Sequence, residues 1–347
     1  MSWKEKRLIT LLSVILAVLC AAVLLVLSGR YRAAQAAKAE QEETGDEAAA
    51  QTSQDDYVAL SYNNGATSLS FAQNEGGAWY WESEPEFPLN DGTVTSILAL
   101  LKSLKPQQTL DLPEDLSAYG LDDPQITLTA STRDGASVEI DMGNTTTDGG
   151  SYYALISSDP GHLFIIPDTL YQAMETPIYE MCVLPDLPVL TEETMTSLLI
   201  QGPRDKESDT SDENSAGARV TTVLTAVSDD GGQISWRSGG ANVTDTADVR
   251  ALMEDLAGLR LSRCVDFHPS DEAASFCGFD NPSTLTVEYR TATGAEETFV
   301  MDIGNQNMDG TGRYVRVGGE SAVYLVELSL LDPLMRLAYQ GLEGSAA

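Results

Sequence analysis

The chain has 347 residues, of which 53 are acidic and 20 are basic, so its formal net charge at pH 7 is −33. This balance argues against two partner classes, nucleic acids and anionic membrane surfaces, because both need a basic protein face. The simplest interpretation of the charge is a strongly hydrated exterior rather than a specific function.

An apolar segment without a charge, Leu8–Leu27, lies near the N-terminus and is 20 residues long. A helix of that length spans about 30 Å, which matches the hydrocarbon core of a bilayer. A cleavable signal peptide usually has a shorter apolar core of about 7–15 residues, followed by small residues at the cut site. We therefore expect an uncleaved signal anchor in the lipid bilayer, with a cleaved signal as the alternative.

Basic residues flank this segment at both ends, so the charge rule for orientation is weakened. We expect residues 1–7 in the cytoplasm, the transmembrane anchor over residues 8–28 and the rest of the chain outside a bacterial cell membrane. Residues 29–55 are rich in Ala, Gln and Glu, and we interpret them as an acidic linker, either partly helical or disordered.

The remainder of the chain contains an internal repeat, which has to be recognised before any other structural prediction. Apolar residues at 94, 97, 98, 101 and 104 recur 155 residues later, and from 138 to 153 the offset is 161. We predict two modules, over 56–190 and 191–342. The repeated motif residues are Tyr119, Gly120, Leu121, Asp122, Pro124, Asp141, Gly143 and Asn144 in the first copy, and Gly278, Phe279, Asp280, Pro282, Asp302, Gly304 and Asn305 in the second.

In the first copy, short alternating runs predict strands near 58–62, 69–71 and 79–81, with Gly- and Asn-containing turns between them. Asn90 or Asp91 is suited to cap a helix whose apolar stripe runs from 94 to 104. Alternation resumes at 126–128, 138–142, 153–155 and 164–166. A second helix is expected from Pro167 to about Met174, with proline in its first turn.

The second copy repeats this order. Strands are expected at 198–200, 220–227 and 234–236, a helix at 245–259, strands at 285–289, 299–303, 314–317 and 323–326, and a helix at 328–342. Residues 203–217 are charged and lack aromatic residues, which predicts a disordered acidic loop. Strands in consecutive hairpins with the helices set apart are typical of an α+β fold, so each module should be a mainly antiparallel sheet with helices.

Histidine and cysteine offer little for catalysis or metal binding. His162 follows a turn, His268 lies in an insertion, and neither has a counterpart in the other copy. Cys264, His268 and Cys277 have a spacing that lacks paired Cys-x2-Cys knuckles, so the zinc signal is weak. Cys182, Cys264 and Cys277 follow the apolar segment, and an odd number allows at most one internal disulfide. Cys264–Cys277 is the most plausible pair from sequence, with reduced cysteines as the alternative.

Three other groups suggest chemistry at first sight. Asp141, Asp148, Asp302 and Asp309 suggest calcium, but their loops lack the ligand spacing of an EF-hand, and turn residues are the simpler interpretation. Acidic pairs such as Glu84/Glu86 and Asp122/Asp123 are expected by chance at this composition. The aromatic run Trp79-Tyr80-Trp81 is suited to a ligand platform, but core packing is the safer expectation.

The chain resembles a family of bacterial membrane-anchored proteins known only as domain of unknown function 4340, in two tandem copies. The resemblance rests on Tyr119–Pro124, Met142–Asn144 and Gly150–Tyr153, with looser matches in the second copy. Copy two places Cys277 where the family usually has an aromatic residue. These motifs are structural turns, so they indicate the family and no activity.

The resemblance implies an auxiliary role beside the ATPase and permease of an ABC-type transporter. We therefore expect a non-enzymatic, extracytoplasmic interaction protein without cofactor or metal, whose partner is a transporter or another envelope component. A cell-envelope hydrolase and a calcium- or glycan-binding wall module are the alternatives.

Overall fold

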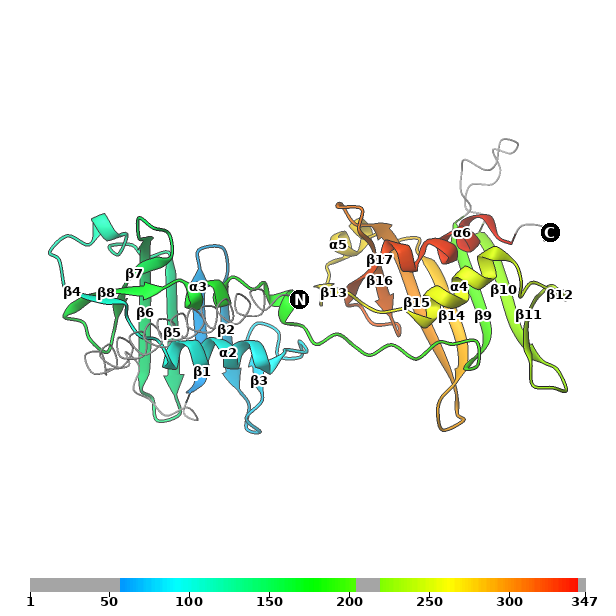
Figure 1. Cartoon of the computed structure of the whole chain (residues 1–347), viewed down its shortest axis with the longest axis horizontal. Coiled ribbons are helices and arrows are strands. Elements are labelled where there is room, and N and C mark those ends of the chain that lie inside the picture. Colours follow the sequence, from blue (N-terminus) through cyan, green and yellow to red (C-terminus); the bar gives the residue numbers. More distant parts are fainter. Residues whose placement is uncertain (1–56, 204–218, 343–347) are drawn as a thin grey trace, which may run out of the picture.

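A computed structural model describes residues 57–203 and 219–342, which form two lobes (Figure 1). We call residues 57–181 module 1 and residues 195–342 module 2; residues 182–194 connect them. The expected anchor and linker, and all but the first residue of the expected loop at 203–217, lie outside the described residues. Within the described ranges, no helix is long and apolar enough to cross a membrane.

Module 1 is a single antiparallel sheet of eight strands in the order β3-β2-β1-β5-β6-β7-β8-β4. Strands β5 to β8 form consecutive hairpins, whereas β4 crosses the module to pair with β8 at the far edge. The strands are β1 (Tyr57–Asn64), β2 (Ser68–Gln73), β3 (Trp79–Trp81), β4 (Gln108–Asp111), β5 (Ile126–Thr132), β6 (Ser137–Thr145), β7 (Ser151–Ile156) and β8 (His162–Pro167).

Module 2 repeats this topology in a nine-stranded antiparallel sheet, ordered β12-β11-β10-β9-β14-β15-β16-β17-β13. The crossing strand is again the one that follows the long helix, and β13 pairs with β17 as β4 does with β8. The strands are β9 (Met195–Pro203), β10 (Arg219–Ser228), β11 (Ile234–Ser238), β12 (Ala241–Asn242), β13 (Arg263–Asp266), β14 (Ser283–Arg290), β15 (Glu296–Gln306), β16 (Gly312–Val317) and β17 (Val323–Glu327).

The helices are few and short, and several of them pack on the sheets (Figure 1). The side-chain amide oxygen of Asn90 accepts a hydrogen bond from the Gly92 N–H, which confirms the predicted N-cap. The α-helices are α2 (Asp91–Lys102), α3 (Thr169–Met174), α4 (Ala247–Ala257), α5 (Asp271–Phe276) and α6 (Asp332–Gln340), and the 3-10 turns are η1 (Ser117–Tyr119), η2 (Ile178–Met181) and η4 (Leu328–Leu330).

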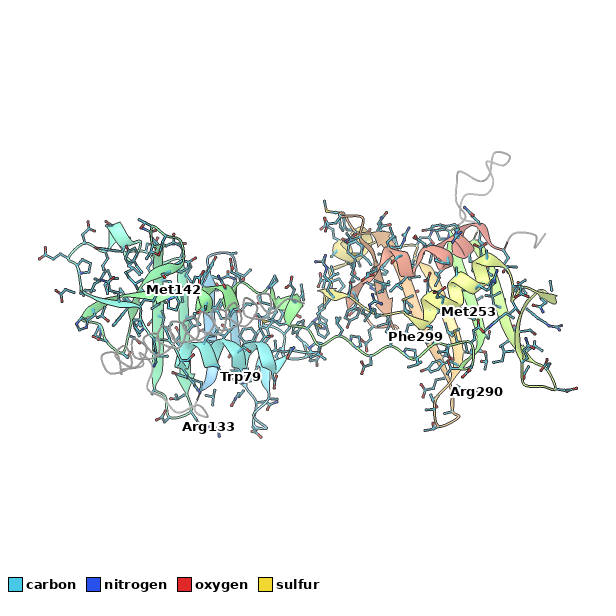
Figure 2. The ribbon with its side chains drawn as sticks, viewed as in Figure 1. Trp79, Arg133, Met142, Met253, Arg290 and Phe299 are labelled. Carbon is cyan, nitrogen blue, oxygen red and sulfur yellow. The ribbon has the colours of Figure 1, made fainter. Side chains whose placement is uncertain are left out.

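Each module has its own hydrophobic core between its helices and one face of its sheet. The predicted apolar stripes are buried in both: Val94, Ile97, Leu98 and Leu101 on α2, and Val249, Leu252, Met253 and Leu256 on α4. Figure 2 labels members of the two cores, Trp79 and Met142 in module 1 and Met253 and Phe299 in module 2. Burial of this size is the main contribution to the stability of each module.

The elements differ from the sequence prediction in several places. Strands β4 and β13 and helix α5 were not expected, because their sequences are short and largely polar. Pro167 ends strand β8 instead of beginning a helix, and Asp168 is the residue before α3. The last helix begins at Asp332, with Pro333 in its first turn, and Leu328–Leu330 forms a separate 3-10 turn.

Candidate functional site

The repeated motif forms the same backbone arrangement in both modules, at the end of a short helix. The N–H groups of Gly120 and Leu121 donate to the carbonyls of Ser117 and Leu116. In module 2, the corresponding donors Gly278 and Phe279 bond Ser275 and Ala274. Both patterns are Schellman motifs, which need a left-handed residue, and the φ angles of Gly120 (70°) and Gly278 (90°) meet that need.

A bulged strand presses against each of these helix ends. The register of β6 on β7 shifts between Met142 and Thr145, and that of β15 on β16 shifts between Ile303 and Gln306. In module 2 the Asn305 N–H donates to the Cys277 carbonyl at 2.7 Å.

The asparagine side chains reach back across the same contacts. The Asn305 side-chain amide donates to the Phe276 carbonyl at 2.9 Å, and that of Asn144 to the Ala118 carbonyl at 3.4 Å. Each bond supplies a partner to a carbonyl at a helix end. The geometry thus gives the Gly-Asn dipeptides a role in holding a helix end on the sheet.

The remaining motif residues lie around these contacts. Leu121 is buried in module 1, while Phe279 in module 2 stacks under the guanidinium of Arg316 at 4.2 Å. Tyr119 packs edge-on against Tyr153 with ring centroids 4.9 Å apart. Asp280 accepts a hydrogen bond from the Ser275 hydroxyl, whereas Asp122, which follows Leu121, is exposed, and Pro124 and Pro282 lead into strands β5 and β14.

Two of the acidic side chains considered for calcium accept hydrogen bonds from neighbouring threonine hydroxyl groups. Asp302 accepts a hydrogen bond from Thr284 at 2.9 Å, and Asp148 accepts one from Thr146. Burial, followed by the charge of Glu139, raises the pKa of Asp141. Among the described residues there is no group of three His, Cys, Asp or Glu side chains placed to hold a metal ion.

The expected Cys264–Cys277 pair is wrong. Both thiols are free, and their side chains belong to different apolar clusters. Cys264 pairs with Tyr324 of β17, whereas Cys277 packs with Val323 and Leu325 on either side of it, so the two cysteines lie against opposite faces of the sheet. The zinc candidate also fails in this geometry, because His268 lies beside Glu84.

A junction between the modules collects several residues that the sequence did not place together. Phe87 comes from module 1 but is buried in the core cluster of module 2. Its ring packs edge-on against Trp81 and Phe267, with centroids 5.6 and 5.5 Å away. Trp81, Leu89 and Ile178 contact both core clusters. The two modules therefore have separate cores that are joined by an aromatic contact.

Polar groups surround this aromatic contact. The Tyr179 hydroxyl donates to Asp266 at 3.2 Å, and burial together with the charges of Asp266 and Glu84 raises the pKa of Tyr179 to about 12. The His268 Nδ1 lies 3.5 Å from the Glu84 Oε2, an ion-pair distance without hydrogen-bond geometry. His162, by contrast, is half exposed and bonds Asp159 within module 1.

The open face of each sheet, opposite the helices, differs between the modules. In module 2 a row of cross-strand neighbours reads Val223, Leu199, Thr286 and Val300. Directly opposed residues on neighbouring strands point to the same face, so these side chains form one surface. The corresponding row in module 1 is polar and reads Ser70, Ser61, Thr129 and Glu139.

The apolar row of module 2 is accessible. Val223 is 46% exposed. Val227, four residues further along β10 and on the same face, is 38% exposed. We call Val223, Leu199, Thr286, Val300 and Val227 the open-face patch. An exposed apolar patch with a polar rim is typical of a protein interaction surface.

The family model described as domain of unknown function (DUF4340) matches the chain twice, over residues 79–182 and 237–338. The chain belongs to this family. Each match contains one long helix, one repeated motif and the hairpins that follow it. No curated protein and no solved structure matches the chain.

The match confirms two tandem DUF4340 copies, as the repeat predicted. It covers the motif and both sides of the junction. The junction and the open-face patch were not predicted, because each depends on contacts between residues far apart in the chain. The one signal in the sequence was the apolar character of Leu199, Val223 and Val300 at positions where module 1 has Ser61, Ser70 and Glu139.

Proposed function

We propose that this DUF4340 protein is a membrane-anchored, extracytoplasmic interaction protein that acts as an auxiliary subunit of an ABC-type transport system. The observation that carries the interaction role is the open-face patch of module 2. Two modules with the same topology differ at corresponding positions, and the change replaces hydroxyl and carboxylate groups with Val and Leu on a solvent-facing surface. Exposed apolar side chains cost solubility, so such a surface is best explained by a partner that covers it.

The transport part of the proposal rests on the family resemblance, in which members accompany exporter-type ATPases and permeases. The apolar segment Leu8–Leu27 supports the anchor, since its length suits a bilayer span. With the anchor in the membrane, the modules stand beside the extracytoplasmic loops of a permease. The energy for transport comes from the ATPase of that assembly, and this chain contributes binding and positioning.

Co-purification from membranes of the native host tests both parts. The full chain carries a C-terminal tag, the membranes are dissolved in a mild detergent, and the bound proteins are identified by mass spectrometry. Recovery of a permease together with its ATPase supports the proposal. Recovery of this chain alone, under conditions that preserve known transporter complexes, contradicts it.

A pair of variants locates the surface. Val223→Glu combined with Val227→Glu places charges on the open-face patch and should abolish co-purification at unchanged thermal stability. Val189→Glu is the matched control, because Val189 is 72% exposed in the connecting segment, away from the patch. If the control loses the partner and the patch variant keeps it, the patch is not the binding surface.

A further inference from the structure

Cys182, the first residue of the connecting segment, meets Cys264 of module 2 at the junction. Cys182 directly follows η2 of module 1 and forms an isolated β-bridge with Leu89. Cys264 lies in the edge strand β13 of module 2, opposite Tyr324. The η2 turn packs against β13, both cysteines pack in the same apolar cluster, and their thiols interact with each other. The two sulfur atoms are therefore neighbours, although 82 positions separate them in the sequence.

The surrounding contacts hold this pair in place. Tyr179, three residues before Cys182, bonds Asp266, two residues after Cys264. The ring of Phe87 packs on both Tyr179 and Phe267, with centroids 6.0 and 5.5 Å away. Because both backbones are fixed next to the cysteines, little conformational freedom remains to be lost when the sulfurs are joined.

We propose that Cys182 and Cys264 are the site of a disulfide that locks module 1 to module 2 under oxidising conditions. The bond requires the sulfurs to approach to about 2.05 Å. It would link the end of module 1 to an edge strand of module 2 and fix the junction. The proposal is independent of the transporter role, since it concerns the chemistry of this chain alone.

The reaction balances with a disulfide of a small molecule or an oxidoreductase as the oxidant. The Cys182 thiolate attacks one sulfur of that disulfide, forms a mixed disulfide and releases one thiolate. The Cys264 thiol then loses its proton, and its sulfur attacks the Cys182 sulfur and expels the second thiolate. The two cysteines lose two protons and two electrons in total, and the oxidant leaves as two thiols.

The environments of the two thiols fit this order. Cys182 is partly exposed, and the hydrogen bond that it accepts from Cys264 lowers its pKa, so it is the thiol that an external disulfide meets first. Cys264 is only 2% exposed and is suited to the second, internal step. Cys277 is also buried, but it lies on the other face of β13 and takes no part.

The test uses the full chain in detergent, with Cys20→Ser to remove the cysteine in the apolar segment. The protein is equilibrated in buffers with different ratios of reduced to oxidised glutathione, quenched with acid and alkylated. Digestion with a protease that cuts at Asp and Glu separates the three remaining cysteines onto different peptides. We expect the Cys182–Cys264 cross-linked peptide in most molecules in the oxidising buffer and its loss in the reducing one.

Three variants make the outcome specific. Cys182→Ser and Cys264→Ser should each abolish the cross-link, whereas Cys277→Ser should retain it. Alkylation of both Cys182 and Cys264 in the oxidising buffer, or a cross-link that includes Cys277, would overturn the proposal. If a variant fails to fold, the peptide map of the parent protein still decides between these results.

Discussion

Gly143 of strand β6 lies directly against the backbone carbonyl of Tyr119, so that a Cβ atom added to it would stand 2.1 Å from that oxygen. Gly304 has the same relationship to the Cys277 carbonyl, at 2.0 Å. Both contacts are to main-chain atoms, which cannot rotate away as a side chain does. The repeat has therefore kept glycine at these positions because a helix end has to pack on a bulged strand.

Gly143→Ala and Gly304→Ala should each destabilise the protein by about 3 kcal/mol, as expected for overpacking against rigid neighbours. Urea unfolding of the purified protein measures the effect. Gly150→Ala is the control, because a Cβ there meets no atom within 4 Å, and it should change stability by less than about 0.5 kcal/mol. Equal stability of all three variants would contradict the packing argument.

Asn305→Ala removes the side-chain amide that donates to the Phe276 carbonyl at 2.9 Å. We expect a loss of about 1 kcal/mol, typical of one internal hydrogen bond. Asn144→Ala should cost less, because the corresponding distance to the Ala118 carbonyl is 3.4 Å. Chemical unfolding of both variants measures the two losses of stability. A larger loss for Asn144→Ala would show that the stability contribution of each asparagine is not set by the length of its hydrogen bond.

The amphipathic helices α2 and α4 could be predicted because their spacing places one apolar stripe on one face. The crossing strand β4 could not, since Gln108–Asp111 contains no buried residue and is fixed only by pairing with β8. The same limit applied to β13, whose pairing with β17 places Cys264 on the opposite face of the sheet from Cys277. Local pattern determines which segments fold, whereas edge pairing is decided by distant partners.

The same contrast between local pattern and contacts with distant residues applies to the candidate sites. The turn character of the repeated motif is visible in its Gly, Asn and Asp residues, because these residue types favour turns and positive φ. The contact of Phe87 with Phe267 joins residues from the two modules, and the interaction of Cys182 with Cys264 joins the connecting segment to module 2. Nothing in the spacing within either copy indicates which surfaces of two copies meet.

The raised pKa of Asp141 predicts that the stability of the protein depends on pH. Burial and the nearby Glu139 raise its pKa above the usual 3.8, so the folded state binds the proton more tightly than the unfolded state. Stability is then lost as the pH rises through this range, because the buried carboxylate has to ionise. Asp141→Asn should stabilise the protein at pH 7, and the gain should vanish near pH 3.

Thermal unfolding across this pH range measures the difference between Asp141→Asn and the parent protein. Glu139→Gln serves as a second variant, since it removes the repelling charge and keeps Asp141. It should give a smaller gain with the same dependence on pH, because burial is the larger cause. A gain for Asp141→Asn that stays constant down to pH 3 would rule out ionisation as its origin.

Phe87→Ala tests the junction. The ring is 3% exposed and fills a space between Trp81, Tyr179 and Phe267, so its removal leaves a cavity where the modules meet. We expect a loss of about 3 kcal/mol from the stability of module 2, as for other buried Phe-to-Ala changes.

The connecting segment 182–194 should also become sensitive to limited proteolysis, because the modules separate more readily once this contact is lost. Phe276→Ala is the matched control, since Phe276 is 61% exposed, and its cleavage pattern should equal that of the parent protein. If Phe87→Ala lowers stability but leaves the segment protected, Phe87 stabilises only the core of module 2, and other contacts hold the modules together.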